Sequence, residues 1–221
     1  RQRQMCIRDS PYSASAIDAT HVLQEMFIPW STDAGTASTS VGATPPGSHT
    51  SWGKWHAHLT DVLADHFAHD RHIRLLNITI RRIVVDRTTA LPYAPAAPSG
   101  AQAHAALAAT AGDGAAGDGR DSMLAFVFYY RTPRSTVADA ELEAMHRRLA
   151  SKALELGGTF YLPYRHHYNS AEMLAAYPGA PAFFESKLRH DPGEVFANAW
   201  YLDYSRRVLT DEQRVQARAK G

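Results

Sequence analysis

The stretch "MLAFVFYYRTPRSTVADAELEAMHRRLASKALELGGTFYLPY", residues 123–164, decides the fold. Residues 123–130 form a continuous apolar run, which is typical of a strand covered on both faces. Residues 136–158 predict an amphipathic helix that ends at two consecutive glycines. Residues 159–164 predict a second strand. One face of the helix collects the large apolar side chains Leu142, Met145, Leu149 and Leu156.

The residues before this stretch supply a matching first half. "HVLQEMFIP" (21–29) alternates and ends at a proline, so it predicts a strand. Residues 52–67 have apolar side chains at helical spacing, and residues 73–85 are β-branched and alternate. The order is therefore β-α-β-β-α-β. It predicts an α+β fold, a ferredoxin-like antiparallel sheet with helices on one face and the other face in need of a cover.

Short helices are expected after the last strand. Asn169 and Glu172 have the spacing of a capping box, and Pro181 is suited to the first turn of the next helix. Within the longer helix, Thr136 and Asp139 also resemble a capping box. Residues 205–221 are mostly polar and predict a C-terminal tail.

Two stretches interrupt this order. Residues 31–51 are rich in serine, threonine and glycine, and residues 94–122 are rich in alanine, glycine and proline. Neither has enough apolar surface to offset the entropy cost of ordering. We predict flexible insertions at both places in a domain that spans residues 11–204.

The first ten residues, "RQRQMCIRDS", differ from the rest and hold the only cysteine, Cys6. They can be encoded by DNA that contains a transposase adapter used to build sequencing libraries. We therefore interpret residues 1–10 as an adapter-derived scar, not native, and expect the true protein to extend further upstream. Removing their three arginines and one aspartate changes the formal net charge from +1 to −1.

The composition of the remaining residues argues against several classes of partner and of chemistry. The balanced charge gives no reason to expect a nucleic-acid partner. Without Cys6 there is no disulfide framework or thiolate chemistry. No apolar run approaches the roughly 20 residues of a membrane span, so a membrane partner is not expected. The sequence leaves the oligomeric state and the compartment open, and it contains no GxGxxG, GxxxxGK[ST] or GxSxG motif.

Individual polar residues suggest sites. Glu25 stands in an otherwise apolar strand, and Arg81, expected on a neighbouring strand, is a candidate partner. Two interpretations stay open: a structural ion pair at the sheet edge, or a polar cluster on the uncovered face that meets a ligand or a second domain. His166 and His167 are adjacent at a strand exit, so we expect at most one of them to serve a pocket.

Histidines are also concentrated between residues 56 and 72. They have no HExxH motif and no carboxylate or cysteine partner at a diagnostic spacing. We predict no metal site. A histidine-rich metal protein is therefore the hypothesis that the sequence favours least.

The C-terminal part resembles a known family. "LELGGTFYLPYRHHYNSAEMLAAYPGAPAFFESKLRHDPGEVFANAWY" (154–201) is similar to the end of FAD-linked oxidoreductases of the vanillyl-alcohol-oxidase (PCMH) type. That family includes aldonolactone and alditol oxidases and decaprenylphosphoryl-ribose oxidase. The shared features are "GG" before a strand, then "YP", then "F…K…DP…F.N". "QEMFIP", "LLNITIRR" and "LAFVFYYR" fall in the family's order, so the resemblance covers roughly residues 20–204.

The resemblance implies a cap (substrate) domain whose sheet lies over the flavin of a separate N-terminal FAD-binding domain, which is missing from this chain. FAD would accept a hydride from a C–H bond beside a hydroxyl of a small-molecule substrate, and the cap would orient that substrate. This chain alone is expected to be inactive. The alternative is a self-contained ferredoxin-like binding or dimerisation module without catalysis.

Candidate site residues follow from the same resemblance. Gln24 or Glu25 matches a polar position before "F.P", and Arg81 matches a cationic position. The segment Tyr164-Arg165-His166 falls where several relatives place a lysine, which leaves the substrate class open. The implied catalytic residues are Arg81, Tyr164 and His166. The implied substrate- or flavin-facing residues are Gln24, Glu25, Thr79, Arg165 and Asn198.

Overall fold

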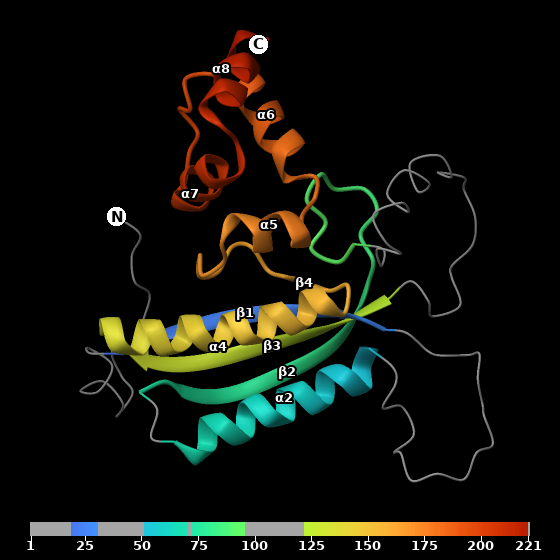
Figure 1. Cartoon of the computed structure of the whole chain (residues 1–221), viewed down its shortest axis with the longest axis vertical. Helices are drawn as coiled ribbons and strands as arrows, with labels where there is room; N and C mark the ends of the chain where they lie inside the picture. The colour runs from blue at the N-terminus through green and yellow to red at the C-terminus, as the bar shows by residue number, and fades with distance from the viewer. Residues whose placement is uncertain (1–18, 31–50, 70–71, 96–121, 221) are drawn as a thin grey trace, which may run out of the picture.

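The computed structural model describes residues 19–30, 51–69, 72–95 and 122–220. Over these residues the chain has six helices and one four-stranded antiparallel sheet, which confirms the α+β class (Figure 1). The predictions for residues 1–10, 31–50 and 96–121 lie outside the described residues. The first six elements are β1 (Ala19–Pro29), α2 (Ser51–Ala68), β2 (Arg74–Val84), β3 (Ser122–Pro133), α4 (Thr136–Glu155) and β4 (Thr159–Phe160).

The strand order in the sheet is β2-β3-β1-β4, and each neighbouring pair is antiparallel. β1 pairs with β3 along its whole length. The pairing of β2 with β3 shifts register between Leu75 and Asn77. β4 pairs with β1 only at Thr159 and Phe160, so the strand expected over 159–164 is shorter than predicted. Pro163 lacks a backbone N–H and cannot continue the ladder.

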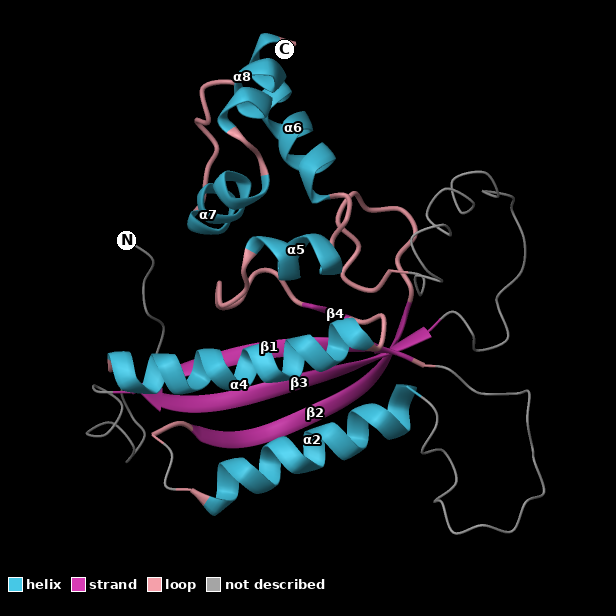
Figure 2. Cartoon of the chain, in the orientation of Figure 1, coloured by secondary structure: helices cyan, strands magenta, loops and turns pink. Residues whose placement is uncertain are grey.

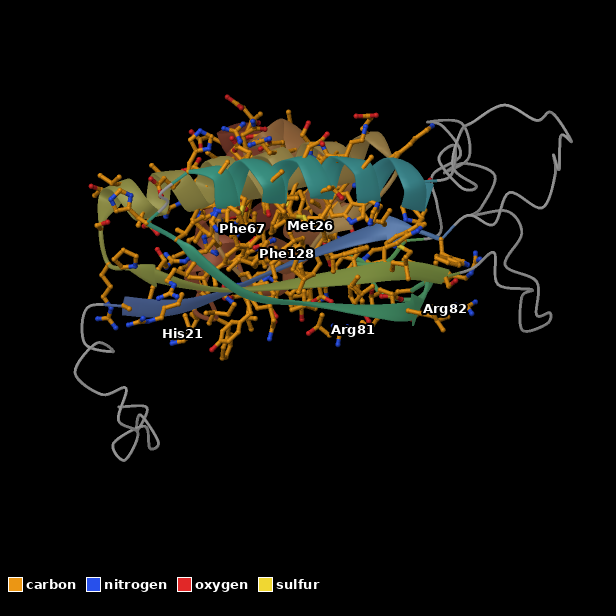
Figure 3. All side chains as sticks on the ribbon, turned by 90° about the horizontal axis from the view of Figure 1, so that it is seen from below. His21, Met26, Phe67, Arg81, Arg82 and Phe128 are labelled. Atoms are coloured by element: carbon orange, nitrogen blue, oxygen red, sulfur yellow. The ribbon has the colours of Figure 1, made fainter. Side chains whose placement is uncertain are left out.

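Both long helices, α2 and α4, lie on the same side of the sheet, as the sequence predicts. Met26 and Phe128 project between the sheet and α2, whereas His21 and Arg81 project from the opposite side (Figure 3). Phe126 is fully buried and its ring contacts Trp55 of α2 at a centroid distance of 5.3 Å. This layer contains most of the apolar core.

Local capping sets the ends of α4. Its N-cap is Ser135, whose side chain accepts from the amide of Ala138, so the predicted Thr136–Asp139 capping box is wrong. The C-terminal end is a Schellman motif, in which the amide of Gly158 donates to the carbonyl of Ala153. Gly157 adopts φ 76°, the left-handed conformation that this motif requires.

Four shorter helices complete the chain and extend from the sheet layer (Figure 2). They are α5 (Ser170–Ala176), α6 (Ala180–His190), α7 (Ala199–Val208) and α8 (Asp211–Ala219). Asn169 and Glu172 form the predicted capping box, and Pro181 occupies the first turn of α6. The predicted polar tail is instead the end of α7 followed by α8, where Leu209 and Ala217 are buried.

The apolar core continues from the sheet into these helices. Phe160 of β4 stacks on Tyr168 with ring centroids 3.6 Å apart, and Phe184 of α6 contacts both Trp200 and Tyr201. The sheet and the C-terminal helices therefore share one hydrophobic cluster. None of the described helices is long and apolar enough to cross a membrane.

Candidate functional site: the open face of the sheet

The open face is the side of the sheet opposite α2 and α4. Antiparallel partners project to the same side, so the register groups Glu25 with Val127 and Thr79, and places Arg81 beside Ala125. This face is formed by the side chains of Leu23, Glu25, Phe27, Asn77, Thr79, Arg81, Ala125, Val127 and Tyr129.

One end of the open face is covered by the chain itself. Phe27, Met123 and Ala125 form a small second cluster with Ala94. The ring of Tyr93 lies 5.2 Å from that of Phe27. The expectation of a fully uncovered face therefore holds only for the part that carries Leu23, Thr79 and Tyr129, all of which are partly or fully exposed to solvent.

An ion pair crosses the centre of the open face. The Nη2 atom of Arg81 lies 2.6 Å from Oε1 of Glu25, and their side chains are 57% and 3% exposed. The sequence predicted that the two residues lie on neighbouring strands, and this is wrong. β3 lies between β1 and β2, so the ion pair spans the middle strand. The hydrogen bond to Glu25 and the charge of Glu25 raise the pKa of Arg81.

Tyr164 belongs to the same group. Burial and then the charges of Glu25 and Tyr161 raise its pKa, while Arg81 acts in the opposite direction. Its ring packs edge-on against Tyr161 at 5.1 Å. Glu25, Arg81 and Tyr164 are thus brought together as predicted site residues, with Thr79 two positions before Arg81 on the same side of β2. The group combines a buried carboxylate, a half-exposed guanidinium and a phenol that stays protonated at neutral pH.

Gln24 and Asn198 lie elsewhere. Gln24 is fully buried on the helix side of β1, and its amide has no hydrogen-bond partner among the described residues. Of the two alternatives Gln24 and Glu25, only Glu25 reaches the open face. Asn198 caps α7 by accepting from the amide of Tyr201 at 2.8 Å. It also lines an aromatic cleft of about 320 Å³ together with Tyr93, Tyr161, Tyr177 and Trp200.

Arg165 and His166 line a different cleft, between α4 and the segment that follows β4. Arg165 is 3.6 Å from Asp139 and His166 is 3.4 Å from Asp203. Tyr164 also borders this cleft, so it lies between the two sites. The predicted residues therefore form two groups rather than one.

Sequence reasoning missed three residues that shape these sites. His146 lies in the apolar stripe of α4, between Leu142 and Leu149, and this position indicates a buried imidazole. Tyr93 and Tyr161 have no such signal, because their importance comes from contacts between distant segments. His166 and His167 both line the same cleft, although the sequence predicts that at most one of them serves a pocket.

No group of three or more histidine, cysteine or carboxylate side chains in the described ranges is arranged to hold a metal ion. Comparisons with known proteins do not assign the chain: no family model matches it, and neither a curated protein nor a solved structure matches it.

The ion pair makes a first prediction. Arg81→Leu should lower the free energy of unfolding by about 1 kcal/mol, because it leaves a buried carboxylate unpaired next to solvent. The double variant Glu25→Leu/Arg81→Leu should recover most of this loss. Urea denaturation of the wild type, the two single variants and the double variant measures this double-mutant cycle. Arg74→Leu, on the same strand, is the control and should stay within about 0.5 kcal/mol of wild type. Additive effects of the two changes would show that the pair contributes nothing.

Proposed function

We propose that this chain is the cap domain of an FAD-dependent oxidoreductase of the vanillyl-alcohol-oxidase type, and that its open face lies over the flavin ring. The observation that carries the proposal is the ion pair of Glu25 and Arg81 on the sheet face opposite the helices, with the phenol of Tyr164 close enough for both charges to act on its pKa. Such a group is costly to build as a purely structural feature, since the carboxylate is almost fully buried.

The topology supports the same proposal. Strands and helices follow each other as β-α-β-β-α-β, and the sheet order is β2-β3-β1-β4 with antiparallel neighbours. We infer that this is the ferredoxin-like split βαβ arrangement. In that arrangement the helices occupy one face only, which leaves the exposed part of the other face available to a second domain.

Each residue then has a distinct task. Glu25 holds the guanidinium of Arg81, whose side chain is 57% exposed and keeps further N–H groups that suit a hydroxyl or carboxylate oxygen of a substrate. Tyr164 keeps its proton at neutral pH, because a phenol has an ordinary pKa of about 10 and burial raises the pKa of Tyr164 further, so its hydroxyl can donate a hydrogen bond. Thr79 adds a hydroxyl on the same face.

In this proposal FAD contacts the open face, but most of its binding contacts come from the flavin domain. The described part of the open face offers a guanidinium, a phenol and a hydroxyl at its exposed centre, which suit contact with a substrate or a flavin edge. When bound, FAD supplies the acceptor for a hydride. Its phosphates would be held by the flavin domain, outside this chain.

The test has two parts. The chain alone should bind no stoichiometric flavin, as measured by visible absorbance after incubation with FAD and gel filtration. In the complete protein, with its flavin domain, Arg81→Ala should lower kcat/KM by roughly thirtyfold while flavin content stays the same, because one charge-assisted hydrogen bond of about 2 kcal/mol is lost. Arg74→Ala is the control. Unchanged kinetics in Arg81→Ala would remove Arg81 from the site.

A second candidate function is a dimerisation module without catalysis. Leu23 is 38% exposed on the open face, and His21 stacks on Tyr129 at 5.3 Å beside it. Such apolar and aromatic side chains also suit a second copy of the sheet. Multi-angle light scattering separates the two: a stable dimer that Leu23→Asp dissociates favours the module, and a monomer favours the cap domain.

A further inference from the structure

A cleft between α4 and the segment after β4 forms a site that is separate from the open face. We call it the α4 cleft; its volume is about 560 Å³. One wall is acidic and belongs to α4, which contributes Asp139 and Glu143. The facing wall is basic and contributes Arg165, His166 and His167. Small-molecule sites have volumes of about 300–1,000 Å³, so the cleft is of suitable size.

His167, which lines this cleft, is paired with the buried His146. Nδ1 of His146 lies 2.9 Å from Nδ1 of His167, and the ring centroids are 5.0 Å apart. Only one hydrogen fits between two such atoms, so one ring donates and the other accepts. His146 is 0% exposed, and its Nε2 atom has no hydrogen-bond partner in the part of the chain that the structure describes. His167 is partly exposed and lines the cleft.

The surroundings decide where a proton is held. Burial, then the charges of His167 and Arg165, keep the pKa of His146 well below its ordinary value. Burial also lowers the pKa of His167; Arg165 and His166 act in the same direction, while Glu143 and Asp139 oppose them. Tyr130 of β3, whose ring lies 5.4 Å from that of His146, adds no charge because its own pKa is raised by burial. Both imidazoles are therefore neutral at pH 7, and an added proton stays on His167.

We propose that the α4 cleft binds a small zwitterion, an α-amino acid or a related amino carboxylate, and that His167 accepts a hydrogen bond from its ammonium group. Asp139 and Glu143 attract the ammonium, and Arg165 binds the carboxylate with its forked N–H groups. Arg165 and Asp139 are 3.6 Å apart, at the long end of an ion pair, so a ligand placed between them replaces only a weak contact.

The ammonium keeps its proton. Because burial lowers the pKa of His167, the neutral ring accepts a hydrogen bond from an ammonium N–H group at Nε2 and takes no proton. This arrangement requires that the Nδ1–H group of His167 donates to Nδ1 of His146, 2.9 Å away. In the proposal His146 is a positioning residue: by accepting this hydrogen bond it fixes the tautomer of His167 that presents a lone pair to the cleft.

Nitrogen-15 NMR of the imidazole rings in the full chain tests the proposal, with glycine, L-alanine and L-leucine as probes. At least one probe should shift the His167 signals in a saturable manner. Acetate and methylammonium, which each carry half of the zwitterion, should bind about tenfold more weakly or worse. Affinity should fall as the pH drops through the pKa of His167, because the protonated ring repels an ammonium group and cannot accept from it.

Variants separate this site from a structural contact. Glu143→Gln and Arg165→Gln should each weaken binding by about tenfold, whereas Glu155→Gln, at the far end of the same helix, should leave it unchanged. His146→Phe should move the neutral His167 ring away from its Nδ1–H tautomer; if that variant does not fold, the variants of Glu143 and Arg165, which are both partly exposed, still decide. The proposal is overturned if no amino acid gives a saturable shift, if acetate binds equally well, or if neutral wild-type His167 carries its proton on Nε2.

Discussion

Replacing Gly158 with alanine is expected to lower the free energy of unfolding by about 3 kcal/mol. A Cβ atom at this position would lie 2.1 Å from the carbonyl oxygen of Phe27 and 2.9 Å from that of Ala153. Both are backbone atoms, so neither can rotate away as a side chain would. Either β1 or the end of α4 must move, and each of these is part of the core.

The comparison is Gly193→Ala. The Cβ there meets only a methyl group of Val195, at 3.7 Å, so the change should stay within about 0.5 kcal/mol of wild type. Urea denaturation followed by circular dichroism measures both variants. Equal effects would show that the close approach of Gly158 to Phe27 does not restrict the chain. The same approach brings β4 next to β1, so Gly158→Ala should also displace the Tyr161–Tyr164 segment from the open face.

The sequence predicted most elements because local rules specify them. Apolar periodicity located the three long strands and the two long helices, and the capping residues of α5 matched the expected spacing. The last helix was not predicted. Its segment is polar, and it is held by long-range contacts: Arg214 is buried and donates to Ser205 and Glu194, which lie on other segments. No local pattern contains this information.

The candidate site was predicted in part for the same reason. A carboxylate in an apolar strand needs a partner, and this rule led to Glu25 and Arg81 without any contact map. Their true separation by β3 depends on the strand order, which local pattern does not determine. The covering of one end of the open face by Tyr93 and the pairing of His146 with His167 depend on the packing of segments far apart in the chain.

Glu194→Gln should also cost about 3 kcal/mol, since it removes the counter-charge of a buried guanidinium. The carboxylate of Glu194 accepts from Arg214 Nη2 at 2.7 Å, from the hydroxyl of Tyr201 at 2.9 Å and from Arg218. The side chain of Arg214 is only 7% exposed. Glutamine has nearly the same side-chain shape as glutamate, and both residues are non-glycine residues at the same φ of 51°. The measured change in stability therefore reports the loss of the negative charge. Glu185→Gln on α6 is the control; it makes no ion pair among the described residues.

The pH dependence of the free energy of unfolding tests the role of this charge more directly. Burial raises the pKa of Glu194, but the hydrogen bonds from Tyr201, Arg214 and Arg218 outweigh it, so the folded-state pKa lies below the ordinary value. The carboxylate therefore stabilises the fold fully above the unfolded-state pKa of about 4.3, and this contribution is lost as the pH falls through the folded-state value. The stability difference between wild type and Glu194→Gln should shrink over that window. A difference that stays constant in acid would mean that the glutamine disrupts the α6–α7 connection through its shape, and that the negative charge does not hold Arg214 in place.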